Sequence, residues 1–210
     1  MTRYDLFFTV FILVVIILLV VPLTHAAFFG FAESYVYVGG FLKFFLFASL
    51  GDVLSRRIRY GDYRVVGLFF KAIVWGIIGI FIVVVFEIFP AGVLQLQSEG
   101  LLPFEGVSVW HALFTSVLMN VFFAPTMMMF HRITDQYIEL HHENERTTLK
   151  ETLRTIDYPS FFGMLGKTIP LFWIPAHTIT FLLPGMYRAF FAALLGVMLG
   201  LFLNLFKRRI

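Results

Sequence analysis

The sequence predicts an all-α fold: a polytopic bundle of about six transmembrane helices that forms one integral membrane domain over residues 1–210. Hydrophobic residues make up 60% of the chain and charged residues only 14%, whereas soluble domains are about one-quarter charged. A chain this apolar cannot cover its surface with polar groups, so lipid is the solvent that fits its composition. The second observation is that long apolar runs alternate with short basic loops, which is typical of membrane proteins.

Most of the apolar runs approach the roughly 20 residues that a helix needs to cross a bilayer. The predicted spans are residues 6–26, 35–55, 65–89, 107–131, 168–184 and 187–206. The first run is too long for the apolar region of a signal peptide, so a retained anchor is favoured over a leader cleaved near Ala26. The fifth run is short and contains Pro170 and Pro175.

The loop charges predict that both ends of the chain lie in the cytoplasm, because basic loops stay on that side. With six spans, one side of the membrane receives Arg3, Arg56, Arg57, Arg59, Arg64, Arg132, Arg146, Lys150, Arg154, Lys167, Arg208 and Arg209. The opposite loops, residues 26–34 and 91–106, contain no Lys or Arg, and Arg188 is the exception. A re-entrant fifth run would give five spans and place the basic C-terminus outside, against the rule.

A polar stretch between the fourth and fifth runs, Ile133 to Thr155, predicts an amphipathic cytoplasmic helix or a helical continuation of the fourth span. Its sparse apolar positions favour a solvated helix against the membrane surface. A docking site for a partner is the alternative.

Small residues four apart predict close helix packing, which drives association in lipid. These seams are Ala72 and Gly76, Gly51 and Ser55, and Ala192, Gly196 and Gly200.

The fourth run also carries a small and polar stripe on one helix face. The stripe consists of Ser116, Asn120, Ala124, Met127 and His131. Pro125 removes a backbone donor and should bend the helix there. An amide such as Asn120 needs a partner inside the membrane, so the stripe predicts either an interhelical hydrogen bond or the wall of a polar pathway.

Three further polar residues lie within the runs. Lys43 is near the middle of its span, where a charge needs an internal partner or an aqueous cavity, and Glu87 is a candidate for that partner. His177 lies between the two prolines of the fifth run, and backbone interrupted in this way must be buried in protein or face water.

Several function classes are not indicated. The net charge of +3 comes from loop residues rather than a nucleic-acid surface, and the absence of cysteine excludes thiolate chemistry. The run from His141 to Glu145 lacks a metal-binding spacing and is more typical of a solvated face. No catalytic or nucleotide-binding motif is present, so we expect no enzyme and no cofactor.

Four short motifs, in order over residues 45–206, resemble the Mpv/PMP family of peroxisomal, mitochondrial inner-membrane and bacterial membrane proteins. They are Gly51-Asp52; Asn120 with Phe123-Ala124-Pro125; Asp157-Tyr158-Pro159; and Trp173, Pro175, Phe181, Pro184 and Arg188. The chain departs from the family pattern where Arg56, Asn120 and Thr180 replace the family's Gln, Gln and Asn.

The resemblance implies a channel-forming or solute-permeable membrane protein. Without an Arg-rich presequence, it also implies a bacterial relative in the cytoplasmic membrane. Together with the polar residues of the spans, it selects polar positions that are candidates either for lining a pore or for a structural role: Lys43, Asp52, Glu87, Asn120, His131, His177 and Arg188. The expected partners are the bilayer and a small-molecule or ion permeant, and a homo-oligomer is left open. A structural or scaffold protein acting through its basic loops is the alternative.

Overall fold

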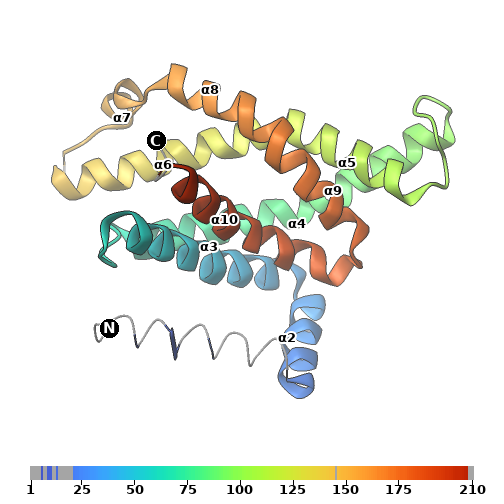
Figure 1. The fold of residues 1–210 in the computed structure, drawn as a ribbon, viewed down its shortest axis with the longest axis horizontal. Coiled ribbons are helices and arrows are strands. Elements are labelled where there is room, and N and C mark those ends of the chain that lie inside the picture. The colour runs from blue at the N-terminus through green and yellow to red at the C-terminus, as the bar shows by residue number, and fades with distance from the viewer. Residues whose placement is uncertain (1–5, 7–8, 11–12, 14–20, 145, 208–210) are drawn as a thin grey trace.

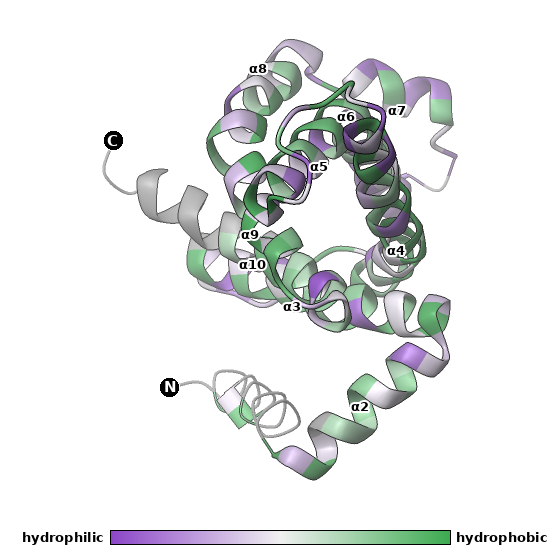
Figure 2. Ribbon diagram, turned by 90° about the vertical axis from the view of Figure 1, so that its right-hand side faces the viewer, coloured by the Kyte–Doolittle hydropathy of each residue, from purple (hydrophilic) through white to green (hydrophobic). Residues whose placement is uncertain are grey.

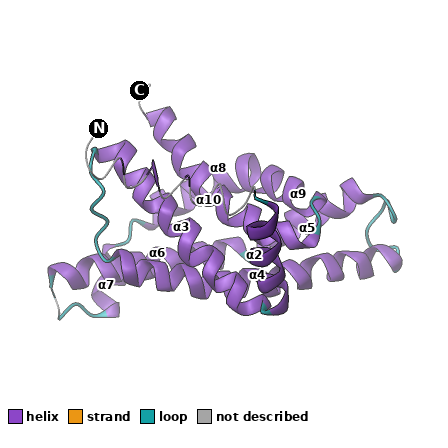
Figure 3. Cartoon of the chain, turned by 90° about the horizontal axis from the view of Figure 1, so that it is seen from below, coloured by secondary structure: helices purple, strands orange, loops and turns teal. Residues whose placement is uncertain are grey.

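The described part of the chain is all-helical, and no strand occurs in it (Figures 1 and 3). The computed structural model describes residues 6, 9–10, 13, 21–144 and 146–207. Its elements are α2 (Pro22–Ser34), α3 (Val36–Tyr60), α4 (Leu68–Ser98), α5 (Ser108–Phe122), α6 (Ala124–Glu143), α7 (Leu149–Thr155), α8 (Tyr158–Thr168), the π-helix η1 (Ile169–Trp173), α9 (Ile174–Leu182) and α10 (Gly185–Lys207). Most of the predicted first span lies outside the described residues, as do Arg3, Glu145, Arg208 and Arg209.

Two described helices, α3 and α4, are long and apolar enough to cross a membrane. A third crossing is obtained if α5 and α6, which meet at an angle of 44°, count as one bent span. The bend supports the prediction made from Pro125, which lies at the start of α6. Because Pro125 has no N–H, the regular hydrogen-bond pattern is interrupted at this point.

Close backbone packing joins α3 to α4. A Cβ built on Gly79 would lie 2.5 Å from the carbonyl oxygen of Gly40, and one on Gly76 would lie 2.5 Å from the ring of Phe41. Gly76 and Ala72 are buried, as predicted for this seam. The seam predicted on the last helix is wrong at Gly196, which is exposed and has no neighbour within 4 Å of a built Cβ.

Helix α4 runs nine residues past the predicted end of its span, through Pro90 to Ser98. Val93 and Gln97 are buried on this extension, so packing favours a continued helix. The Gln97 side-chain amide donates a hydrogen bond to the carbonyl of Pro103 at 3.2 Å. Its oxygen lies 3.1 Å from Nδ1 of His111. These contacts fix the connection from α4 to α5.

The predicted cytoplasmic helix over residues 133–155 is not one helix. Helix α6 continues the fourth apolar run as far as Glu143, and a separate helix, α7, follows after a short loop. Thr148 starts α7 because its hydroxyl accepts from the N–H of Glu151, whose carboxylate accepts from the N–H of Thr148. This reciprocal cap is a strong local helix start.

The fifth apolar run is part of a longer helical segment that begins ten residues before the predicted start at Thr168. Asp157 caps it by accepting from the N–H of Ser160 at 3.1 Å, and Pro159 stands in its first turn. Helices α8, η1 and α9 then follow one another without a loop. The Asp157-Tyr158-Pro159 motif therefore encodes a helix start.

Helices α3, α4, α5, α6, α9 and α10 gather into one bundle, and α2 projects from it beside α3 (Figures 1 and 2). The bundle exposes large apolar side chains, such as Phe70, Phe81 and Ile88 on α4. Its interior is an apolar core that also contains the buried polar residues Lys43, Lys71, Thr115, Ser116, Asn120, His177 and Thr180. This distribution fits a lipid environment, where the outer surface is apolar and polar groups face inward.

Candidate functional site

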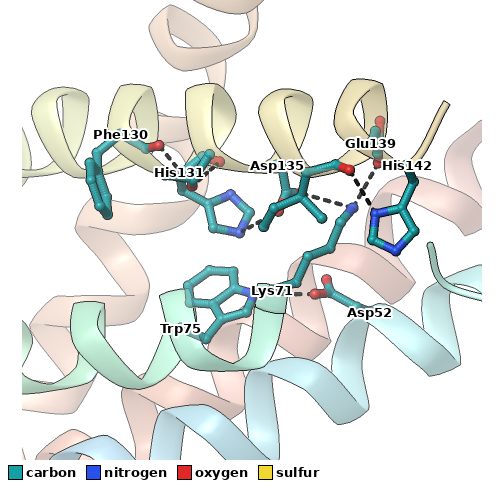
Figure 4. Close-up of polar contacts among 10 residues, drawn as sticks. Asp52, Lys71, Trp75, Phe130, His131, Asp135, Glu139 and His142 are labelled. Carbon is teal, nitrogen blue, oxygen red and sulfur yellow. Dashed lines mark hydrogen bonds and ion pairs between the residues drawn. The ribbon is translucent and has the colours of Figure 1, made fainter. Parts of the chain in front are cut away.

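Charged side chains, together with one tryptophan and one histidine, gather between α3, α4 and α6 (Figure 4). We call this group the ionic cluster; its members are Asp52, Lys71, Trp75, His131, Asp135 and Glu139. Lys71 and Trp75 are one turn apart on α4, and the three α6 residues follow one another at four-residue spacing. Both helices therefore present their members on a single face.

Lys71 joins α4 to α6. Its ammonium is buried and lies 2.7 Å from Glu139 Oε1 and 3.5 Å from Asp135 Oδ2. A buried ammonium is costly unless carboxylates compensate it, and removing one partner of such a pair is strongly destabilising. The two carboxylates of α6 provide this compensation, which fixes the register of α6 against α4.

Trp75 connects the same cluster to α3. Its indole Nε1 donates a hydrogen bond of 3.1 Å to Asp52 Oδ2. Its ring lies against the imidazole of His131, with ring centres 4.1 Å apart. Asp52 of the Gly51-Asp52 motif therefore bonds across the bundle to α4.

One contact of the cluster is incomplete. His131 Nε2 and Asp135 Oδ1 face each other at 3.7 Å, which is beyond hydrogen-bond distance. Both atoms are buried and neither has another hydrogen-bond partner. Two carboxylates, those of Asp135 and Glu139, also share a single lysine ammonium, so these contacts hold more acid than base when His131 is neutral.

A second polar group, which we call the central polar band, joins α5 to α9. It consists of Ser116, Asn120 and His177, all of them buried. The Asn120 side chain lies 3.1 Å from His177 Nδ1, and its amide donates to the carbonyl of Ser116 at 2.8 Å. The interhelical hydrogen bond expected for Asn120 is therefore present, and His177 is its partner.

The π-helix shapes the α9 side of this band. The N–H of Ile174 bonds to the carbonyl of Ile169, five residues back, so the backbone pairing shifts by one residue between Pro170 and Pro175. The Ser116 hydroxyl donates to the Ile174 carbonyl at 2.8 Å. Such π-segments are rare and are frequent at functional sites.

Aromatic rings enclose His177. The Trp173 ring stacks on its imidazole with ring centres 5.3 Å apart, and Phe86 of α4 meets it edge-on at 6.0 Å. The Trp173 Nε1 is buried without a hydrogen-bond partner. The central polar band is thus a small polar patch within an apolar and aromatic core that includes the motif residue Phe181.

The polar stripe predicted on the fourth run supplies both groups. Ser116, Asn120 and Ala124 are buried, and His131 lies at the other end of the stripe within the ionic cluster. Asn120 and His131 are eleven positions apart, or about 16 Å along a helix. The two groups therefore occupy different levels of the bundle.

The remaining candidates lie elsewhere. Lys43 is buried under the ring of Phe29, 5.8 Å from its centre, while Glu87 is exposed, and no ion pair joins these two described residues. The pairing expected for them is wrong. Arg188 donates from Nε to the carbonyl of Leu183 at 3.0 Å, so it caps the end of α9.

Sequence reasoning missed Lys71, Trp75, Asp135 and Glu139. A signal for two of them was present, because Asp135 and Glu139 continue the four-residue spacing of the stripe beyond His131. Lys71 appeared as a charge near the start of its span, and only the fold brings it to α6.

Comparisons with known proteins add no assignment. No family model, no curated protein and no solved structure matches the chain.

Proposed function

We propose that this protein is a channel, or passive pathway, for small solutes or ions across a membrane. The observation that supports it best is the inward placement of polar groups at two levels of a bundle with an apolar outer face. Ionisable residues inside a membrane are costly and commonly mark solute or ion routes. Asn120 and His177 form the inner level of this route, and His131 with the ionic cluster forms the other.

The proposal includes six spans with both termini in the cytoplasm. In support, the start of α4 packs against α6, because a Cβ on Gly67 would clash with Ile138. The basic α3–α4 loop and the basic segment after α6 therefore share one end of the bundle (Figure 1). The ionic cluster lies nearest to this end, which the positive-inside rule assigns to the cytoplasm.

The proposal also includes membership of the Mpv/PMP group and a location in a bacterial cytoplasmic membrane. The ordered motifs support it, together with their structural roles. Asp52 links α3 to α4, Asp157 caps α8, and Trp173 packs on His177. Ala124 and Pro125 begin α6, and Pro184 precedes α10.

The test is solute flux through purified protein in liposomes. Wild type should pass ions or small metabolites, and Asn120→Leu should change the rate because it removes the amide that bonds to His177. Val121→Leu is the matched control, since Val121 is the next residue on α5 and is exposed. If wild type and Asn120→Leu are both tight to every solute, the pathway is refuted.

A scaffold acting through its basic loops is the second candidate. It is favoured by the direct contact between Asn120 and His177, which holds α5 against α9. It is also favoured by the exposure of Arg146, Lys150 and Arg154 around α7, where a partner can reach them. Replacing these three by Gln should abolish the cellular function of a scaffold and leave the flux of a channel in liposomes unchanged.

A further inference from the structure

His131 and Asp135 face each other on α6 without a hydrogen bond between them. The facing atoms, His131 Nε2 and Asp135 Oδ1, are 3.7 Å apart, buried and without other partners. A neutral imidazole carries a single proton, and when that proton is on Nδ1 both facing atoms are acceptors. A protonated imidazole becomes a donor at Nε2 and supplies the missing hydrogen bond.

We propose that His131 is a proton-responsive latch that holds α6 against Trp75 of α4. When its imidazole takes up a proton, Nε2–H closes on Asp135 Oδ1 and the ionic cluster gains a second cation. When the proton leaves, the contact opens and Lys71 alone balances the carboxylates. Histidine is suited to this role because its charge changes near physiological pH.

The charges that face His131 come from each helix packed against it. Helix α3 contributes Asp52 and helix α4 contributes Lys71, while α6 itself contributes Arg132, Asp135 and Glu139. The Asp135 and Glu139 carboxylates outnumber Lys71 by two to one, so they repel each other when His131 is neutral. A proton on His131 reduces this repulsion, whereas the burial of the ring, Lys71 and Arg132 oppose its uptake.

The bond between His131 and Asp135 lies within α6. Tighter packing of α6 on α4 as the pH falls is therefore expected from the charged imidazole against the Trp75 ring, 4.1 Å away between ring centres, which is a cation–π contact. Asp135 then bonds to His131 through Oδ1 and to Lys71 through Oδ2, the atom that already lies 3.5 Å from the Lys71 ammonium. If the route of the proposed function runs past the cluster, its flux should fall with pH. This last consequence rests on the proposed function, but the proton uptake does not.

Trp75 reports the state of the latch. Its ring lies 4.1 Å from the imidazole of His131, and a protonated imidazole in contact with an indole quenches its fluorescence. In a variant with Trp110→Phe and Trp173→Phe, Trp75 is the sole tryptophan of the chain. Its emission in detergent should fall in one transition as the pH is lowered from about 8 to about 5, which brackets the usual histidine range.

Further single variants decide the assignment. His131→Gln should remove the transition, and Asp135→Asn should move its midpoint to lower pH by about one unit, because the imidazolium loses its counter-ion. His142→Gln is the matched control, since His142 lies on the same helix and is exposed, and it should leave the titration unchanged. Circular dichroism verifies that each variant is folded.

The proposal is overturned if the transition survives in His131→Gln, or if Asp135→Asn leaves its midpoint in place. A transition that disappears only in Asp52→Asn assigns the proton to the carboxylate bonded to Trp75 and overturns it as well. A protein that is tight to all solutes but still titrates through His131 refutes the pathway alone. The two ideas therefore fail separately.

Discussion

Replacing Gly79 by alanine is expected to destabilise the packing of α3 on α4. The added Cβ would lie 2.5 Å from the carbonyl oxygen of Gly40 and 2.8 Å from Cβ of Phe44. Carbon–oxygen contacts between packed elements are about 3.3–3.6 Å. The two helices must therefore separate by roughly 1 Å at this point, and the obstacle is backbone that cannot rotate away.

The size of the effect follows from two opposing terms. Overpacking a close contact costs about 1–3 kcal/mol. Alanine in place of glycine inside a helix returns about 0.5–1 kcal/mol. Gly92, on the same helix, has no atom within 4 Å of a built Cβ, so Gly92→Ala should show only the favourable term. The two variants should differ in the free energy of unfolding by about 1–3 kcal/mol, the overpacking term alone.

The assay is reversible unfolding in mixed detergent micelles, followed by circular dichroism. Gly79→Ala should unfold at lower denaturing-detergent concentration than Gly92→Ala. Equal stability of the two variants would refute the close approach of α3 and α4. Gly40→Ala provides an independent check, because its Cβ would lie 2.9 Å from the carbonyl oxygen of Gly79.

Three other predictions use the same protein. Lys71→Met should lower the free energy of unfolding by about 3 kcal/mol, because it leaves the α6 carboxylates uncompensated; unchanged stability would contradict the link between α4 and α6. Asp157→Ala should lower the free energy of unfolding by about 1 kcal/mol, because α8 loses its cap. Asp157→Asn should keep most of the wild-type stability, because Asn can also cap a helix. The Arg56 guanidinium lowers the pKa of the Asp62 carboxyl to about 2. The stability from that pair is therefore full above the ordinary Asp value of about 3.9 and is lost as the pH falls through about 2. A carbon NMR titration of Asp62 that gives an ordinary midpoint would contradict it.

The helices were predictable because backbone N–H and C=O groups in lipid must bond to each other, and few structures allow this. A long apolar run must satisfy its own N–H and C=O groups, which favours a helix. The run that contains Pro125 illustrates how much detail this gives, since its bend was predicted from one residue and α5 meets α6 at 44°. The ends of α4 were less predictable, because Pro90 is compatible with either a helix end or a continued helix, and the burial of Gln97 decides between them.

The site was predictable only within single helices. Asn120 and His131 were found because their spacing places them on one helix face. The partner of Asn120 is His177, 57 positions later, and no periodicity connects them. Lys71 is 68 positions from Glu139, and both look like ordinary charges at the end of a span. Long-range pairs of this kind depend on which helices become neighbours, which a single sequence does not encode in its local pattern.

The bend at Pro125 connects the two polar levels. It lies between Asn120, through which α5 bonds to α9, and His131, through which α6 meets α4. Because Asn120 is buried and the His131 ring packs on Trp75, straightening the bend should move at least one of them off its partner. A change that loosens the ionic cluster is therefore felt at the central polar band through α6 and α5. The same geometry explains why a route through this bundle would need both levels to rearrange together.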